Sequence, residues 1–469
     1  MNFLAIDFGA GSGRVLLGSL EEGFLRMEEI HRFANRQVRL GRHVYWDFPA
    51  LFEDMKVGLR KAGGLGLEIA GIGIDTWGVD FGLIDSSGNL LGNPVSYRDG
   101  RTEGLPAKVF EVLDPTEHYG VNGTQVMEIN SLFQLYSLKA EGSWQLAVAD
   151  KLLFMPDLFN FFLTGEARNE YTISSTSELL DARARDWDWS TIEQLGLPKR
   201  IFGQIAMPGT VIGRLKREIA EETGLGEVEV IAVGSHDTAS AVVAVPAGVG
   251  EKQVAFLSSG TWSLLGVEIS APILTEEARL AELTNEGGVG GRITFLQNIT
   301  GLWFMQRLMK EWEERGEPQT YEDILQAAST STTAAIIAVD APDFQNPVSM
   351  EHAIQAFCRA QGQPPLESKG DVVRCVLQSL AFKYAQAVEK LNKLLPEPIR
   401  ELHIIGGGCR NGLLNELTSK SLGLPVTTGP VEATGVGNIL TQALAKGALA
   451  NLEEARAVVR RSREAGLLD

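Results

Sequence analysis

The sequence contains few of the residues that build metal centres and disulfide frameworks. Among its 469 residues there are three cysteines, Cys358, Cys375 and Cys409, and six histidines. The cysteines form no Cys-x-x-Cys pair, and no histidine has ligand spacing to another, so a zinc site is not expected. Cys358 and Cys375 are close enough along the chain to meet. A disulfide would be unusual in a cytosolic protein, so the sequence leaves open whether they pair.

Long apolar runs are also missing. No stretch approaches the roughly 18 uninterrupted apolar residues that suggest a membrane-spanning helix, so no membrane span is expected. Residues 1–8 pass directly into a predicted core strand, without the basic and apolar regions of a secretory signal. These features favour the cytoplasm. The sequence also lacks a Gly-x-x-x-x-Gly-Lys-Ser/Thr run, which excludes a P-loop kinase.

The sequence has fewer basic residues than acidic ones. The chain has 42 Lys and Arg residues against 60 Asp and Glu residues, a net charge of -18. Such a protein would repel the phosphates of nucleic acid, so we expect no nucleic-acid partner. A small phosphorylated ligand is still possible, because backbone N–H groups and one or two well-placed cations can make a site locally positive.

The length and two similar segments predict an α/β protein of two large domains. The chain is too long for one hydrophobic core. Two apolar runs around a Gly/Ser-rich turn predict a β-hairpin at 3–18, and a similar pattern recurs at 254–266. Between them, the Pro/Gly-containing stretch 246–252 is typical of a linker. We therefore expect an N-terminal domain of residues 1–245 and a C-terminal domain of residues 246–469.

Periodicity predicts further elements within these domains. Alternating or continuous apolar runs indicate strands, and apolar residues three and four positions apart indicate helices. Asn411 is a good N-cap for a helix that runs to residue 422. The expected strands are 69–75, 81–84 and 402–405, a turn is expected at 85–88, and the other expected helices are 131–140, 156–164 and 372–395.

The first hairpin carries a candidate phosphate site. Asp7 ends a buried strand, where a carboxylate is costly unless a hydrogen bond or a cation compensates it. The turn 9–13 can direct N–H groups at an anion, and Arg14 offers a planar cationic fork for phosphate oxygens. Asp7 is the candidate to hold Mg²⁺, through water, since Mg²⁺ usually retains several waters. The alternative is a plain tight hairpin.

Two other polar turns are candidates for the same chemistry. The turn 258–262, Ser-Ser-Gly-Thr-Trp, offers small donors for a second phosphate contact. Asp237 follows the apolar strand 228–233 at a strand-to-helix junction, where it could accept a proton from an attacking hydroxyl. A helix-capping role for Asp237 or Thr238 is the competing interpretation.

A glycine-rich segment follows the last predicted strand. Residues 406–411, Gly-Gly-Gly-Cys-Arg-Asn, superficially match a dinucleotide-binding fingerprint. That fingerprint requires glycine where this chain has Asn411. A glycine floor beneath an adenine or ribose fits the same segment.

The order of these motifs resembles the FGGY carbohydrate-kinase family of the actin-like ATPase superfamily. The resemblance rests on Asp7 to Arg14, Gly234 to Asp237, Ser258 to Thr261 and Gly406 to Gly408, and extends over essentially the whole chain. Other stretches narrow it to members that phosphorylate the ketose L-rhamnulose: residues 30–33, 73–81, 97–99, 285–288, 298–303 and 429–434.

The resemblance implies a fold, two ligands and a set of site residues. Both domains should have the actin-like, ribonuclease H-like core, with ATP and Mg²⁺ in the cleft between them and Asp237 as the general base. The protein should be a monomer or a homodimer. Asp7 would lie near the metal. The implied ATP-binding residues are Ala10, Gly11, Ser12, Gly13, Arg14, Thr261, Gln306 and Gly407. The implied sugar-binding residues are Gly78, His236, Asp237, Thr238 and Asn298.

One departure and three alternatives accompany this resemblance. Many family members have Thr where this chain has Ala10, which leaves one phosphate hydrogen bond to the backbone or to Ser12. The alternatives are a family member acting on L-fuculose, L-ribulose or D-xylulose, an actin-like ATPase or sensor that transfers no phosphate, and a dinucleotide-dependent oxidoreductase.

Overall fold

The computed structural model describes the chain except residues 247–252, 346 and 469. Most of the stretch 246–252, where we place the domain boundary, lies outside the described residues. The chain divides into two compact units, neither of which is one continuous segment. The first unit comprises Met1–Val249, Glu268–Phe295 and Glu432–Asp469, and the second comprises Gly250–Val267 and Leu296–Val431.

The first unit contains a mixed six-stranded sheet. β1 pairs in parallel with β6 and antiparallel with β2, so the hairpin predicted at 3–18 and the strand predicted at 69–75 are confirmed. β6 is also parallel to β14. The strand order is β13 (Val211–Arg214), β14 (Glu229–Ile231), β6 (Ile69–Thr76), β1 (Asn2–Phe8), β2 (Ser12–Glu21) and β3 (Phe24–Ala34).

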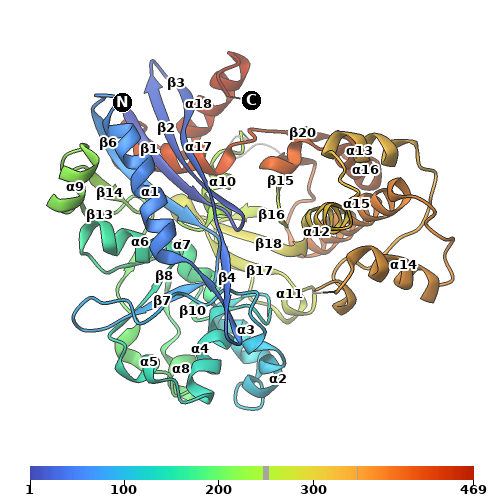
Figure 1. Cartoon of the computed structure of the whole chain (residues 1–469), viewed down its shortest axis with the longest axis horizontal. Helices are drawn as coiled ribbons and strands as arrows, with labels where there is room; N and C mark the ends of the chain where they lie inside the picture. Colours follow the sequence, from blue (N-terminus) through green and yellow to red (C-terminus); the bar gives the residue numbers. More distant parts are fainter. Residues whose placement is uncertain (247–252, 346, 469) are drawn as a thin grey trace. The chain divides into compact units, whose positions relative to one another are not determined.

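Helices from both ends of the chain cover this sheet. α1 (Phe48–Gly63) contacts β2 and β3, whereas α17 (Ala433–Ala445) contacts β1 and β6. Figure 1 shows α17, red in the sequence colouring, beside the blue strand β1. Because both faces of β1 are covered, its sequence is an almost unbroken apolar run, and Phe3, Leu4, Ala5, Ile6 and Phe8 are fully buried.

The second unit repeats the strand plan of the first. β15 and β16 form the second predicted hairpin, and β19 and β20 continue the sheet in parallel with β15. The order β18-β16-β15-β19-β20 therefore corresponds to β3-β2-β1-β6-β14 of the first unit. The bounds are β15 (Val254–Ser259), β16 (Trp262–Ile269), β18 (Ile293–Thr300), β19 (Glu401–Ile405) and β20 (Val426–Thr428).

The long amphipathic helix of the second unit is α15 (Lys369–Leu394). It begins three residues before the predicted start at 372, because Ser368 and Asp371 form a capping box that sequence periodicity does not reveal. Its predicted apolar face is buried. Cys375 on this helix and Cys358 on α14 (Met350–Ala360) are buried free thiols, and burial raises the pKa of Cys375.

Most of the other predicted elements are confirmed. α4 (Ser131–Ala140) has the predicted bounds, and α6 (Met155–Thr164) starts one residue early. The Asn411 side chain accepts a hydrogen bond from the Leu414 N–H at 3.0 Å and so caps α16 (Gly412–Leu422). In the described part of the chain, no helix is long and apolar enough to cross a membrane.

The remaining strands have two to four residues, and the remaining helices have between four and 13 residues. The strands are β4 (Gln37–Leu40), β5 (His43–Trp46), β7 (Phe81–Ile84), β8 (Lys151–Phe154), β9 (Asn169–Glu170), β10 (Leu180–Asp181), β11 (Asp186–Trp187), β12 (Ile205–Ala206) and β17 (Thr284–Gly287). The helices are α2 (Leu105–Val109), α3 (Pro115–Asn122), α5 (Trp144–Val148), α7 (Tyr171–Ser174), α8 (Trp189–Gln194), α9 (Arg217–Thr223), α10 (Asp237–Val243), α11 (Glu276–Leu280), α12 (Trp303–Glu314), α13 (Tyr321–Thr330) and α18 (Leu452–Glu464).

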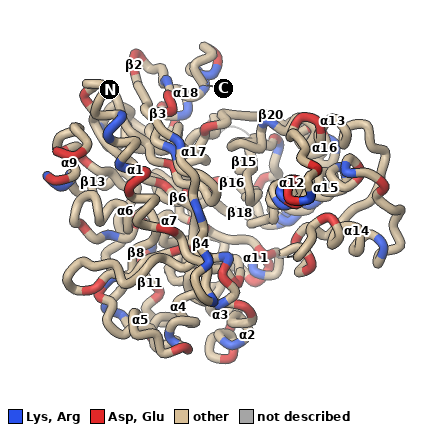
Figure 2. The backbone as a smooth tube through the Cα atoms, in the orientation of Figure 1, with Lys and Arg blue, Asp and Glu red and all other residues tan. Residues whose placement is uncertain are grey.

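Charged residues are spread over the elements of both units. Figure 2 shows Lys and Arg interspersed with Asp and Glu along the described chain. The described chain therefore shows no long run of charge of one sign in this view.

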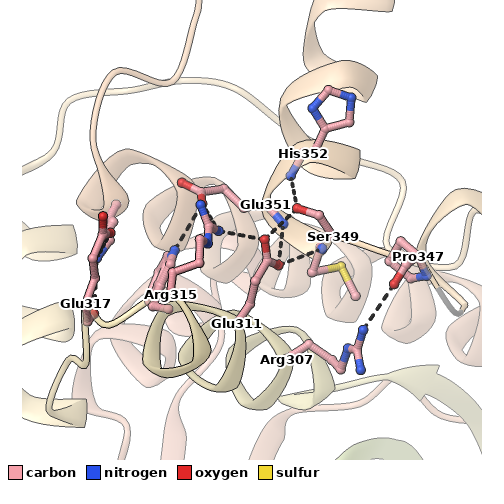
Figure 3. A network of polar contacts seen from close by, with 11 residues as sticks. Arg307, Glu311, Arg315, Glu317, Pro347, Ser349, Glu351 and His352 are labelled. Carbon is pink, nitrogen blue, oxygen red and sulfur yellow. Dashed lines mark hydrogen bonds and ion pairs between the residues drawn. The ribbon is translucent and has the colours of Figure 1, made fainter.

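A polar network joins α12 to α14 in the second unit. Figure 3 shows Glu311 of α12 directed at the first residues of α14. Its carboxylate accepts hydrogen bonds from the Ser349 hydroxyl at 2.5 Å and the Met350 N–H at 2.9 Å, and Arg315 pairs with it at 2.6 Å. Glu311 therefore satisfies N–H groups at the start of a neighbouring helix, which have no partner inside that helix.

We expect Glu311→Ala to destabilise the protein by about 1–2 kcal/mol, the usual effect of losing an N-terminal cap. Burial alone would raise the pKa of Glu311, but the hydrogen bonds from Ser349 and from the backbone of α14 outweigh it and lower that pKa. The stabilisation is thus present above the unfolded-state pKa and is lost as the pH falls through the lower folded-state pKa. Urea unfolding at neutral pH and in acid measures both effects. Glu314→Ala, an exposed change on the same helix, should leave the free energy of unfolding within about 0.5 kcal/mol.

Candidate active site

Three aspartates lie at one end of the first sheet. The parallel register of β1 and β6 places Asp7 opposite Asp75. The next residue of β6, Thr76, forms a parallel bridge with His236, and its N–H donates to the Ser235 carbonyl at 2.9 Å. Asp237 begins α10 directly after this bridge. The carboxyl ends of adjacent parallel segments therefore bring Asp7, Asp75 and Asp237 to the same edge of the sheet, where α/β proteins usually bind ligands.

Asp237 is the first residue of α10, and the cap position is occupied by His236. The competing interpretation of Asp237 as the capping residue is therefore wrong. About a third of its side chain, 34%, remains accessible, so a substrate hydroxyl can reach it. Withdrawal from bulk water raises the pKa of Asp237, the neighbouring His236 lowers it, and the charge of Asp7 raises it further. A carboxylate with a raised pKa is suited to accept a proton.

His236 lies between two carboxyl groups. Its Nε2 is 3.4 Å from Oδ1 of Asp237, and its Nδ1 is 3.1 Å from Oε2 of Glu286 on β17. Burial alone would lower the pKa of His236, but the charge and hydrogen bonding of Glu286, together with the charges of Asp237 and Glu170, outweigh burial and raise that pKa. The backbone N–H of His236 donates to the Thr172 hydroxyl at 3.1 Å. The backbone of His236 is thus fixed, and its imidazole lies between the carboxyl groups of Asp237 and Glu286.

The predicted phosphate turn is open to solvent at its tip. Gly11 is exposed, Ala10 and Ser12 are half-buried, and Gly13 is buried. The Gly9 N–H donates to the Ser12 carbonyl at 2.9 Å, which closes the turn. Backbone groups at such an exposed tip can approach an anion without a side chain in the way.

Arg14 does not point freely at this turn. Its guanidinium forms ion pairs with Asp7, the predicted metal residue, and with Glu432, which immediately precedes α17. Burial alone would lower the pKa of Arg14, but the charges of Asp7 and Glu432 outweigh it and raise that pKa. The pairing with Glu432 links two segments 418 residues apart and was not predicted from the sequence.

Gly78 lies in a turn that a buried aspartate organises. The neighbouring Val79 has a positive φ of 66°, and its N–H donates to the Thr176 hydroxyl at 3.1 Å. Oδ2 of Asp80 accepts hydrogen bonds from the indole N–H groups of Trp46 and Trp77 at 2.6 and 3.0 Å. Asp80 therefore holds the turn that presents Gly78, a role that sequence reasoning missed.

Asp80→Asn should destabilise the protein by about 1–3 kcal/mol, the cost of leaving a buried polar group unsatisfied. Oδ1 of Asp80 accepts from the Gln134 side-chain amide at 3.0 Å, and Arg101 holds the other end of that amide at 2.6 Å. The NH2 group of an Asn side chain would point either at the Gln134 amide or at the indole N–H groups. Both of these are donors, so one hydrogen bond would be replaced by a contact between two donors. Thermal unfolding measures the loss. Asp343→Asn, the same change at an exposed position, is the control and should change stability by less than about 0.5 kcal/mol.

In the second unit, two predicted ATP-binding residues meet. The Gln306 side-chain amide on α12 donates to the Thr261 hydroxyl at 3.0 Å. The glycine segment lies on the same hairpin: a Cβ on Gly408 would come within 2.0 Å of the Ser259 hydroxyl oxygen, so only glycine fits there. Gly407 beside it has nothing within 4 Å of its would-be Cβ. The segment thus presents an open backbone surface next to Thr261.

Asn298 lies on β18 in the second unit and is half-buried, whereas the other predicted sugar-binding residues, Gly78, His236 and Thr238, lie in the first. The Thr238 hydroxyl donates to Asp237 at 3.2 Å. The structure therefore brings Asp7, His236, Asp237 and Thr238 to one sheet edge in the first unit. In the second unit it joins Thr261 to Gln306.

The described residues contain no cluster of three or more His, Cys, Asp or Glu side chains that could hold a metal ion by themselves. Asp7 supplies a single carboxylate. This donor set suits Mg²⁺ bound mainly through nucleotide phosphates and water, which needs only one or two protein carboxylates.

Two functional candidates lie in the stretches 73–81 and 285–288, where the sequence analysis assigned them no role. Asp75 is fully buried, with Oδ2 held by the Asn438 amide at 2.6 Å and Oδ1 without a hydrogen-bond partner. The sequence pattern that identified Asp7, a carboxylate at the end of an apolar strand, also applies to Asp75. Glu286 lies in a stretch that the resemblance singled out, but its pairing with His236 could not be predicted, since it depends on a contact across 50 positions of the chain.

Known protein families match nearly the whole chain. The N-terminal domain of the FGGY family of carbohydrate kinases matches residues 2–244, and the C-terminal domain of that family matches residues 255–446. A rhamnulokinase of Bacteroides thetaiotaomicron is 46% identical over 461 residues, covering 98% of this chain and 94% of that protein. A rhamnulokinase of Halalkalibacterium halodurans is 38% identical over 460 residues, covering 98% of this chain and 97% of that protein.

Solved structures of sugar kinases share the fold. A xylulose kinase from Lactobacillus acidophilus superposes with a TM-score of 0.80 at 16% identity, covering 97% of this chain and 92% of that chain. A glycerol kinase of Plasmodium falciparum, solved with ADP, gives a TM-score of 0.78 at 15% identity, covering 98% of this chain and 92% of that chain. At these identities the likeness concerns the fold alone, and it confirms the expected two-domain actin-like architecture.

Proposed function

This chain belongs to the FGGY family of carbohydrate kinases, and we propose that it transfers the γ-phosphoryl group of ATP to the 1-hydroxyl of L-rhamnulose. The observation that carries this substrate assignment is the similarity, over almost the full length, to proteins named rhamnulokinase. The motifs singled out at residues 73–81 and 298–303 support the same substrate.

Asp237 is the proposed general base. Its side chain is partly accessible at the edge of the sheet, and its raised pKa favours proton uptake. In phosphoryl transfer the protein mainly aligns the reactants and neutralises charge, since the transferring group passes through a loose transition state. Asp237 accepts the proton of the sugar hydroxyl as the oxygen–phosphorus bond forms and the bond to the ADP oxygen breaks. Gly78, His236, Thr238 and Asn298 are the proposed sugar contacts.

The proposed ATP contacts come from both hairpins. The turn formed by Ala10, Gly11, Ser12 and Gly13 supplies backbone N–H groups, and Thr261, Gln306 and Gly407 supply the contacts of the second unit. Arg14 contributes positive charge while it holds Asp7 and Glu432 in place. Asp7 would hold a divalent cation, proposed to be Mg²⁺, which when bound neutralises charge on the phosphates.

The test is ADP release with ATP and Mg²⁺ across a panel of L-rhamnulose, L-fuculose, L-ribulose and D-xylulose, with glycerol as a control. We expect the highest kcat/KM for L-rhamnulose. A preference for another ketose would overturn the substrate assignment but not the family. ADP release independent of every sugar would contradict phosphoryl transfer to a sugar and favour an ATPase.

A further inference from the structure

One acidic side chain beside the proposed base has no part in the function described so far. Glu286 is 4% exposed, and its Oε2 lies 3.1 Å from Nδ1 of His236, the imidazole that adjoins Asp237. A carboxylate at this depth is costly unless a positive partner compensates it. Within the described first unit, His236 is the only basic side chain that the structure records beside this carboxylate.

The backbone that carries Glu286 is held on both sides. The preceding residue, Asn285, accepts a hydrogen bond from the Ile273 N–H at 2.8 Å and donates to the Gly123 carbonyl at 3.1 Å. The following residue, Gly287, donates its N–H to the Ser175 hydroxyl at 2.7 Å. All four residues of β17 are buried. Glu286 is therefore presented to His236 by a rigid strand.

The backbone that carries the imidazole is fixed as well. The backbone N–H of His236 donates to Thr172, whose hydroxyl in turn donates to Glu170 at 2.6 Å. Three acidic groups act on the imidazole: Glu286 from β17, Asp237 from α10 and Glu170 from the end of β9. Burial raises the pKa of Glu170 to about 7, so its charge is partly suppressed at neutral pH. Asp237 in turn faces His236, Asp7 and Asp75.

We propose that Glu286 is a positioning residue for phosphoryl transfer, which holds the His236 imidazole protonated at both nitrogens and oriented so that Nε2–H faces Asp237. Glu286 compensates the positive charge of the imidazole, and the imidazole keeps the Asp237 carboxylate ionised and pointed in one direction. Without Glu286 the buried imidazole loses its proton, since burial disfavours the charged form. This role of Glu286 adds to the proposed function and depends on Asp237 being the general base of phosphoryl transfer.

The kinetic test compares Glu286→Gln and Glu286→Asp with the parent protein. Glu286→Gln should lower kcat on the order of 10-fold, as expected for a group that orients a functional residue, with a smaller change in KM. Losing one neighbouring cation should move the acidic limb of the kcat/KM profile to higher pH by about one unit, because Asp237 then holds its proton more tightly. Glu286→Asp should recover part of both effects. Glu277→Gln, a change of an exposed acid earlier in the same chain segment, should change neither.

A second measurement does not depend on turnover. Nitrogen NMR of the histidine side chains follows the protonation of His236, whose signals are identified by their loss in His236→Gln. We expect His236 to stay doubly protonated to higher pH in the parent protein than in Glu286→Gln. In a protein that already carries His236→Gln, adding Glu286→Gln should not shift the acidic limb of the kcat/KM profile further. The effects of two residues that act through one another are not additive.

The outcomes separate the two proposals. An unchanged His236 titration in Glu286→Gln overturns the positioning role, whatever sugar the enzyme prefers. A rise in KM alone, with His236 unaltered, would make Glu286 a direct sugar contact and would likewise overturn it. A sugar-independent ATPase with the expected His236 shift would contradict the proposed function while leaving the Glu286–His236 pairing intact.

Discussion

Replacing Asp237 with Asn should lower kcat for the preferred ketose by roughly 10²-fold or more, the usual effect of removing a general base. Asn has nearly the same shape but cannot accept the proton of the sugar hydroxyl at neutral pH. ATP binding should be retained, because the proposed ATP contacts lie in the two hairpins and the glycine segment. Steady-state ADP release and calorimetric titration with ATP measure the two quantities.

The matched control is Asp186→Asn, which removes one carboxylate from an exposed position of the same unit. Its turnover should equal that of the parent protein. If Asp237→Asn turns over at a near-normal rate, another group takes the proton and the assignment of Asp237 fails. If ATP binding is lost together with turnover, Asp237 acts on the nucleotide instead.

Gly437→Ala should both destabilise the protein and impair catalysis. A Cβ at Gly437 on α17 would lie 1.8 Å from the backbone carbonyl oxygen of Ser240 on α10, so one helix must move. Forcing atoms into a well-packed interior costs about 1–3 kcal/mol, which exceeds the roughly 1 kcal/mol that Ala gains over Gly in a helix. Because α10 begins at Asp237, its displacement also moves the base, and a shift of about 1 Å can lower turnover by about 10²-fold.

Chemical unfolding and kcat together test this prediction. Gly120→Ala is the control, since Gly120 also lies within a helix of the first unit but its added Cβ would meet nothing within 4 Å. That change should be neutral or stabilising by up to about 1 kcal/mol. A Gly437→Ala protein with unchanged stability and turnover would mean that α10 and α17 tolerate separation, contrary to the close packing described.

The elements that the sequence predicted well are those whose signal is local. The hairpins at β1–β2 and β15–β16 each combine two apolar runs with a Gly/Ser turn, and the cap at Asn411 needs only residues a few positions away. The start of α15 was misjudged because a capping box overrides apolar periodicity in the first turn. The small strands around the first sheet, β9 to β12, were not predicted, because elements of two residues carry no periodic pattern.

By itself, then, the sequence determined the α/β architecture with two related halves, the family, and the short motifs that contain the candidate site residues. Motifs are made of neighbouring residues, and a carboxylate at the end of an apolar strand can be recognised from the few residues around it. Only the tertiary structure decided what those residues touch. Arg14 is held between Asp7 and Glu432, Asp75 is tied to α17, and Glu286 reaches His236 across 50 positions. The physical reason is that ion pairs and pKa shifts depend on distance and burial, which are set by how the parallel strands and α17 pack.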